Sequence, residues 1–280
     1  MNVKEKFKTV YGPLKSWRYG RSLGIDPIGE TSVCSFNCVY CQLGEIEKIT
    51  SDRQIFIPTA TILNDLKNFA PWNVDMITLS GSGEPTLALN LGEILQGIKE
   101  ITHQKTLVLT NGTLLNNSLV RKELNYADEV SVKIDGLNQD QLNKINRPVA
   151  NLLLEDMEIG IEKFAQEYKG KMSIQTMMLK AWDDNIKSSY LTMIKRISNL
   201  RSPSNNIEIQ LNLPSRPKPL KRQLDGRGNH SQASEREYPI RVLKCIDWQI
   251  LKQFADEITQ ETGLNVNLPK PPTTDTINNN

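Results

Sequence analysis

Residues 34–41 read Cys34-Ser35-Phe36-Asn37-Cys38-Val39-Tyr40-Cys41. The chain of 280 residues contains four cysteines, and three of them fall in this short stretch with the spacing C-x3-C-x2-C. Thiolates are soft ligands that suit iron–sulfur clusters and zinc. A loop with this spacing wraps around one metal centre and leaves a coordination position that the loop itself does not fill. What fills that position decides the function.

The residues alone leave three interpretations of this loop open. In the first, Cys34, Cys38 and Cys41 hold three irons of a [4Fe–4S] cluster and leave the fourth iron free. In the second, the distant Cys245 completes a closed four-ligand site for zinc or for an electron-transfer cluster. In the third, the cysteines are buried or redox-active thiols without a metal. Zinc knuckles favour paired C-x2-C units, and the sequence has neither a second pair nor a histidine at the usual zinc spacing.

The composition predicts a globular protein of the cytoplasm. Hydrophobic residues make up 38% of the chain and charged residues 24%, and the length suits one large domain. No stretch approaches the roughly 18 consecutive apolar residues that a membrane helix needs, so we expect no membrane contact. The first residues lack the apolar core of a signal peptide. In the reducing cytoplasm, clustered cysteines more often bind metal than form disulfides.

The net charge of +2 is unevenly distributed. Residues 1–24 carry six Lys or Arg against one Glu, and residues 214–244 carry eight against three acids, so each segment sums to +5 and the remainder to −8. Two basic segments on an acidic body are able to contact the phosphates of an acidic partner such as RNA. Solvated, flexible surface is the simpler explanation, because neither segment contains a recognisable RNA-binding module.

Strand and helix patterns alternate about six times along the chain, which predicts a parallel α/β architecture. The expected strands cover residues 29–33, 76–80, 106–110, 129–135, 171–179 and 207–213. The expected helices cover residues 59–69, 91–101, 115–124, 152–167, 186–200 and 247–262. Loops that follow parallel strands share one face, and in barrels that face carries the chemistry. The cysteine loop, the turn at Gly81–Gly83 and Asn111-Gly112 all follow strands and are therefore expected to converge.

Several of these strands alternate apolar and polar residues, most clearly at 130–135, 172–175 and 207–212. Parallel strands that are covered on both faces would instead be nearly continuous apolar runs. A barrel lumen that holds a polar ligand satisfies the alternation, because one strand face packs on helices and the other lines the lumen. A sheet half exposed to water is the alternative.

The same patterns predict how the chain is divided. We expect an irregular N-terminal segment packed on the barrel, a core, a mobile loop and C-terminal helix, and a disordered tail, at residues 1–28, 29–213, 214–262 and 263–280. Within the third part, the prolines and glycines of residues 214–240 favour a loop that covers the active face.

The cysteine run with Tyr40 before its last cysteine resembles the cluster loop of the radical S-adenosylmethionine superfamily. The stretch Ser80-Gly81-Ser82-Gly83-Glu84-Pro85 is similar to the glycine-rich turn with which that superfamily binds the methionine amino group. The resemblance implies a partial (β/α)6 barrel with a [4Fe–4S] cluster and S-adenosylmethionine as cofactors. It also implies reductive cleavage to a 5′-deoxyadenosyl radical that abstracts hydrogen from a substrate. An electron donor such as flavodoxin or ferredoxin would reduce the cluster.

A narrower resemblance spans most of residues 11–216. It rests on five short segments that are similar to a group of radical proteins related to 4-demethylwyosine synthase, namely Arg21–Asp26, Cys41–Gly44, Ser80–Leu87, Leu109–Gly112 and Ile145–Pro148. That synthase rebuilds a guanine in transfer RNA, so the resemblance implies a tRNA-modifying enzyme as an alternative function. The synthase carries a second cluster on additional cysteines, whereas this chain has only Cys245 left.

The resemblance and the strand ends together indicate which residues contact the cofactor. Cys34, Cys38 and Cys41 are expected to bind the cluster and to act in catalysis. The other expected contacts share a position on the cysteine loop or at the end of a strand, and they are Tyr40, Gly81, Gly83, Glu84, Asn111, Lys133, Asp135 and Gln175.

Each of these assignments has a structural alternative. Glu84 is expected to accept from the ammonium of S-adenosylmethionine, or else to be a solvated loop carboxylate. Asn111 is expected to bind the carboxylate or ribose, or else to form an Asn-Gly turn. Lys133, Asp135 and Gln175 are expected to face the lumen and bind ribose or substrate, or else to form a salt bridge there. For the whole protein, the rival from another class is an electron carrier or a zinc-stabilised protein that binds RNA.

Overall fold

The structure is a computed structural model that describes residues 7–180, 182–214, 216–222 and 239–271. Its main sheet has eight strands in the order β1-β2-β5-β6-β7-β8-β9-β12. Seven consecutive strands of this sheet run parallel, namely β2 (Gly20–Ile25), β5 (Met76–Leu79), β6 (Thr106–Thr110), β7 (Glu129–Lys133), β8 (Lys171–Met177), β9 (Asn206–Asn212) and β12 (Asn265–Asn267). The predicted α/β class with a parallel, barrel-like sheet is confirmed.

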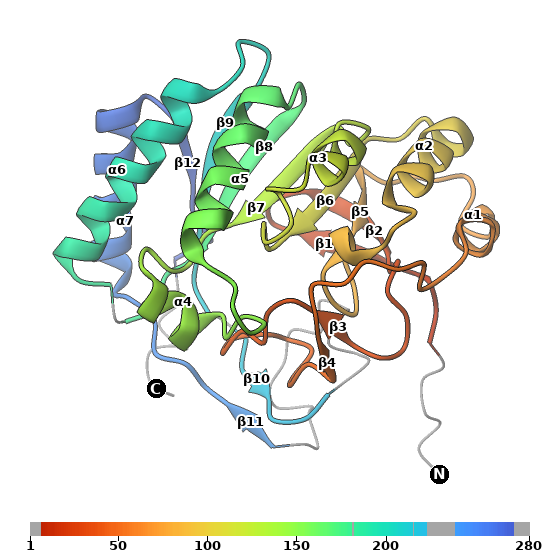
Figure 1. Cartoon of the computed structure of the whole chain (residues 1–280), viewed down its shortest axis with the longest axis horizontal. Helices are drawn as coiled ribbons and strands as arrows, with labels where there is room; N and C mark the ends of the chain where they lie inside the picture. Colours follow the sequence, from red (N-terminus) through yellow and green to blue (C-terminus); the bar gives the residue numbers. More distant parts are fainter. Residues whose placement is uncertain (1–6, 181, 215, 223–238, 272–280) are drawn as a thin grey trace.

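Helices alternate with these strands, and all of them except the short helix at Gln139–Ile145 cover the outer face of the curved sheet (Figure 1). They are α1 (Thr59–Lys67), α2 (Leu91–Thr102), α3 (Ser118–Leu124), α4 (Gln139–Ile145), α5 (Leu154–Glu167), α6 (Asp184–Leu200) and α7 (Trp248–Thr262). The apolar stripe of α2, with Leu91, Ile94, Leu95 and Ile98 at 0% exposure, shows why a helix forms there, since its spacing puts one face against the sheet. None of the described helices is long and apolar enough to cross a membrane.

The N-terminal edge of the sheet differs from the prediction. The first parallel strand is β2 and not residues 29–33, and β1 (Val10–Ser16) pairs with it in antiparallel fashion. Within the described part of residues 1–28, the chain therefore supplies strands of the sheet instead of packing on it. The sequence did not predict these strands because glycines interrupt their apolar pattern. Gly24 sits in β2 because a Cβ there would lie 2.3 Å from the ring of Tyr11, and Gly20 follows the hairpin turn with φ +67°.

The C-terminal edge also differs. Residues Asn265–Asn267 form β12, which runs parallel to β9 with Val266 opposite Ile209. The predicted tail at 263–280 therefore begins too early, and its last residues, 272–280, lie outside the described part of the chain. Most of the predicted loop at 214–240 lies outside it as well. Its two ends form the short antiparallel pair β10 (Lys218–Pro219) and β11 (Ile240–Arg241).

The polar faces of the strands are enclosed. Ser131, Ser173 and Gln210 are at most 2% exposed although they point away from the helices. Tyr19 from the β1–β2 turn packs on the same side of the sheet against Met76 of β5 and against Leu107 and Leu109 of β6. The alternative of a sheet half exposed to water is therefore wrong, and the alternation in the sequence marks an enclosed lumen.

Candidate active site

The cysteine loop lies at the carboxyl end of the parallel strands. It begins at β3 (Val33–Cys34), a two-residue strand that pairs with β4 (Lys48–Ile49) outside the main sheet. The segment 145–149, which follows α4, holds the loop through backbone hydrogen bonds. Asn37 N donates to the Asn146 carbonyl at 2.9 Å, and Val39 N donates to the Ile145 carbonyl at 2.9 Å. The chain's own backbone hydrogen bonds therefore hold the loop against the barrel.

The three thiols of the loop are buried and surrounded by N–H donors. Burial raises the pKa of Cys38 to about 11, and it raises the pKa of Cys34 and of Cys41 as well. Phe36 N and Asn146 Nδ2 each lie 3.4 Å from a cysteine sulfur, that of Cys34 and that of Cys38 respectively. Donors aimed at sulfur favour the thiolate form, which is the form that binds metal.

This donor set fits an iron–sulfur cluster. Among the described residues, no three His, Cys, Asp or Glu side chains are grouped so as to hold one metal ion. A cluster does not require such a grouping, because each thiolate of a [4Fe–4S] cubane binds a different iron. The fourth cysteine, Cys245, is exposed, whereas each cysteine of the loop is only partly exposed as a whole residue and has its thiol group buried. The residues present therefore fit a cluster that is held by Cys34, Cys38 and Cys41.

The glycine-rich turn follows β5 and packs directly on the cysteine loop. A Cβ at Gly83 would lie 1.7 Å from the carbonyl oxygen of Val33, so only glycine allows this approach. Gly81 has φ +125°, and a Cβ there would lie 2.4 Å from Cγ of Asp26. Both predicted glycines are thus required by the packing of the turn. The turn also leaves the backbone free of side chains beside the thiols.

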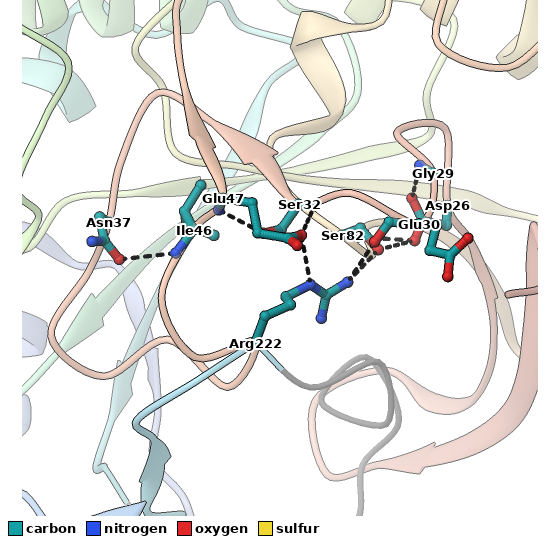
Figure 2. A network of polar contacts seen from close by, with 9 residues as sticks. All are labelled: Asp26, Gly29, Glu30, Ser32, Asn37, Ile46, Glu47, Ser82 and Arg222. Carbon is teal, nitrogen blue, oxygen red and sulfur yellow. Dashed lines mark hydrogen bonds and ion pairs between the residues drawn. The ribbon is translucent and has the colours of Figure 1, made fainter. Parts of the chain in front are cut away.

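Asp26, which ends the segment Arg21–Asp26 of the narrower resemblance but was given no role in the site, fixes the shape of this turn. Its carboxylate is fully buried and accepts four hydrogen bonds. The donors on one oxygen are Ser82 N at 2.9 Å and Ser82 Oγ at 2.7 Å, and those on the other are the amides of Ile28 and Gly29. Figure 2 shows this arrangement beside Arg222, which reaches Ser82 from the opposite side.

Glu84 is buried, and its carboxylate accepts hydrogen bonds from other groups of the protein. Its carboxylate accepts from Thr86 N and Oγ1, from Thr110 Oγ1 at 2.6 Å and from Asn111 N at 2.7 Å. Burial raises its pKa, and these hydrogen bonds act against that rise. The alternative of a solvated carboxylate is wrong, because Glu84 is 2% exposed. The carboxylate connects the glycine turn to the end of β6.

Asn111 joins the cysteine loop to the same point. Its Nδ2 donates to Ser35 Oγ at 2.8 Å and lies 3.6 Å from the sulfur of Cys34. Its Oδ1 accepts from Thr113 N, which is the Asx turn expected of an Asn-Gly pair. The structure therefore brings Asn111 close to the thiols and also confirms its local turn.

Tyr40 and Asp135 form a second buried connection. The Tyr40 hydroxyl donates to Asp135, whose carboxylate also accepts from Asn146 Nδ2 and from Met177 N, each at 2.8 Å. Asn146 in turn contacts the sulfur of Cys38. Burial and the Asp135 carboxylate raise the pKa of Tyr40, so the phenol stays protonated. Asp135 thereby ties β7 and β8 to the cysteine loop.

Lys133 and Gln175 face the lumen beside these groups. They are partners in the register of β7 and β8 and are both half-buried. The ammonium of Lys133 lies 4.8 Å from the ring centroid of Tyr40, and no salt bridge to it is found among the described residues. The alternative of a Lys133–Asp135 salt bridge is thus not seen there. The two polar ends remain available in the lumen.

Two cationic residues of the segment Arg216–Arg222 were also missed. Lys218 is bonded to the cysteine loop, and Arg222 lies between Glu47 and Ser82 (Figure 2). In the sequence they were only part of a basic run, and nothing local distinguished them from solvated surface charges. Asn146, by contrast, lies in a segment that the narrower resemblance had already marked.

Comparisons with known proteins agree with this geometry. The profile of the radical SAM superfamily matches residues 31–189, more than half of the chain. A UPF0026 protein of Synechocystis sp. is 58% identical over 260 residues, which are 93% of this chain and 96% of that protein. A probable GTP 3′,8-cyclase of Saccharolobus islandicus is 30% identical over 131 residues, which are 46% of this chain and 40% of the cyclase. The crystal structure of a radical SAM methyltransferase from Sphaerobacter thermophilus aligns with a TM-score of 0.59 at 11% identity, over 91% of this chain and 67% of that chain.

Proposed function

The chain belongs to the radical SAM superfamily and to the UPF0026 family, and on that premise we propose that it is a radical enzyme acting on a substrate held in the barrel lumen. The superfamily uses a [4Fe–4S] cluster and S-adenosylmethionine. Bound at this site, they supply one-electron cleavage of the sulfonium and a 5′-deoxyadenosyl radical that abstracts hydrogen. The observation that carries the proposal is the group of three buried thiols that the glycine turn meets at the carboxyl ends of the strands.

The protein's own residues then have separable roles. Cys34, Cys38 and Cys41 hold the cluster, and the backbone of Gly81–Gly83 lies where a methionine amino group can approach. Because Glu84, Asn111 and Asp135 already accept or donate several protein hydrogen bonds, we assign them mainly to positioning.

Substrate contacts are assigned to the lumen. Lys133 and Gln175 have polar ends that face it, so we assign them to the ribose of the cofactor or to the substrate. Tyr40 supports Lys133 through its ring and excludes water from Cys38. We expect the enzyme to work in the cytoplasm and to receive its electron from a flavodoxin or ferredoxin.

The test is the replacement of Cys38 by alanine in the anaerobically reconstituted protein. We expect the wild type to hold about four irons per chain and to release 5′-deoxyadenosine when reduced with dithionite in the presence of S-adenosylmethionine. The Cys38→Ala variant should lose both the iron and the product. Cys245→Ala is the matched control, since its exposed side chain should leave both unchanged. A wild type that binds zinc, or a cluster that never cleaves S-adenosylmethionine, would refute the proposal.

A second candidate makes the substrate a guanine of transfer RNA. Exposed basic residues at the face of the cysteine loop support it, namely Arg147 beside the loop and Lys180 and Lys244, which pair through their backbones after β8. One relative is named for a reaction of GTP, and the segment motifs resemble the wyosine-related group. Filter binding of total transfer RNA, with Lys180→Glu and Lys244→Glu as charge-reversal variants, tests it. Equal binding by wild type and variants would count against it.

A further inference from the structure

Lys218 is a buried lysine that contacts the cysteine loop from a distant part of the chain. Its residue is 1% exposed, which is rare for a lysine because a buried ammonium loses its hydration. Nζ donates to Glu45 Oε1 at 2.8 Å and to the carbonyl oxygen of Cys38 at 3.2 Å. The charge therefore lies against the backbone of a cysteine assigned to the cluster.

The segment Arg216–Arg222, here named the strap, holds this lysine in place. Gln42 Nε2 of the loop donates to the Arg216 carbonyl at 3.2 Å. A Cβ at Gly44 would lie 2.1 Å from the Lys221 carbonyl oxygen, so loop and strap backbones touch. At the far end, Arg222 Nη2 donates to Ser82 Oγ at 2.9 Å and so reaches the glycine turn (Figure 2). The strap thus spans both halves of the candidate site.

Glu45 neutralises Lys218 only in part. The Glu45 side chain is 46% exposed, whereas that of Lys218 is 1% exposed. Water therefore screens the carboxylate much more than the ammonium. A buried cation with a solvated partner keeps a positive field toward the interior, where its hydrogen-bond partner is the carbonyl oxygen of Cys38 and where it also favours the thiolate of Cys41. An anionic group at the three thiols would complete its neutralisation.

We propose that Lys218 holds the backbone of Cys38 in position and also stabilises the reduced form of the cluster. This inference rests on the proposed function and adds a residue to it. Iron–sulfur potentials depend on net charge and on hydrogen bonds near the cysteines, and a cluster gains one negative charge on reduction. A fixed cation on the Cys38 carbonyl stabilises that extra charge. The strap supplies this cation to the site from residues that follow β9 in the chain.

The test compares two lysines of the strap. Lys218→Met removes the buried charge at similar length, and Lys221→Met removes an exposed charge from the same segment as the matched control. Each protein is reconstituted anaerobically, assayed for iron and sulfide, and titrated with dithionite while the EPR signal of the reduced cluster is followed. We expect Lys218→Met to lower the reduction equilibrium constant about tenfold, which is about 59 mV for one electron. Lys221→Met should leave the potential near that of the wild type.

Two further variants keep the test decisive if Lys218→Met loads its cluster poorly. Lys218→Arg keeps the charge and should restore the potential. Glu45→Gln removes the partner carboxylate and should shift the potential upward, opposite to Lys218→Met. Equal potentials in Lys218→Met and Lys221→Met, measured on their loaded fractions, overturn the inference while the proposed function stands. A wild type that takes up no cluster overturns both.

Discussion

At the scale of single residues, the candidate site is set by close approaches at two glycines. Gly83 lies where the backbone carbonyl of Val33 leaves no room for a side chain, and Gly81 lies where the Asp26 side chain leaves none. These contacts join the turn after β5 to the entry of the cysteine loop. The glycines therefore determine how closely the turn approaches the start of the cysteine loop.

Replacing Gly83 by alanine tests this relation. Since the new Cβ would fall 1.7 Å from a carbonyl oxygen, the turn must move, and we expect a loss of about 3 kcal/mol in the free energy of unfolding. Urea unfolding of the metal-free protein measures it. Gly263→Ala is the control: it imposes a left-handed φ of +69° in open space and should cost about 1 kcal/mol. Equal costs for both variants would contradict the steric argument.

The sequence revealed those site residues whose signal is local. The cysteine spacing and the glycine turn are short motifs, and the structure brings both together. Asp26 and Lys218 escaped notice because their partners are remote, 56 residues away at Ser82 and 180 residues away at Cys38. An aspartate before a single proline and a lysine in a basic run look ordinary until the fold brings each of them to its distant partner.

At the scale of elements, periodicity was a reliable guide where elements are amphipathic. The strands from β5 to β9 and six of the described helices lie within a few residues of their predicted bounds, whereas the short α4 was not predicted. The N-terminal hairpin was missed because glycines weaken the strand pattern of β2. The three residues of β12 carry no pattern of their own, and they form a strand because the edge of β9 offers hydrogen bonds.

Truncation tests the role of β12. A chain that ends at Gly263 loses Leu264, which is 5% exposed, and uncovers the edge of β9. We expect its free energy of unfolding to fall by about 2 kcal/mol for the lost burial, and the open edge to cause aggregation. Urea midpoints and light scattering measure the two effects. A chain that ends at Pro271 keeps β12 and should match the full chain; if both truncations behave alike, β12 has no such role.

At the scale of the whole molecule, the β1–β2 turn closes the end of the partial barrel that lies opposite the cysteine loop. Tyr19 enters the lumen from the first strands, and its hydroxyl donates to Gln210 Oε1 of β9 at 2.9 Å. Arg18 Nη1 lies 3.4 Å from the same oxygen. The turn that leads into β2 is thereby joined to β9 across the gap that an incomplete barrel leaves.

Two variants of Tyr19 distinguish the packing of its ring in the lumen from its hydrogen bond to Gln210. Tyr19→Ala leaves a cavity among Met76 and its neighbours, and we expect it to cost about 3 kcal/mol of unfolding free energy. Tyr19→Phe keeps the ring and loses one hydrogen bond, so it should cost about 1 kcal/mol. Thermal and urea unfolding of the metal-free chain measure both. If the phenylalanine variant is as unstable as the alanine variant, the hydrogen bond and not the filled lumen closes the barrel.

The strap also bears on the order in which the site is made during synthesis. The ribosome releases the cysteine loop early, but the lysine that meets Cys38 comes 180 residues later. Chains fold from the N-terminus as they emerge, so a nascent chain presents its three thiols for most of its synthesis without this cation. Metal that enters before Lys218 has emerged meets an unfinished loop. Insertion after release would meet the complete one, so we expect released chains to take up a cluster more readily than nascent chains that end before Lys218.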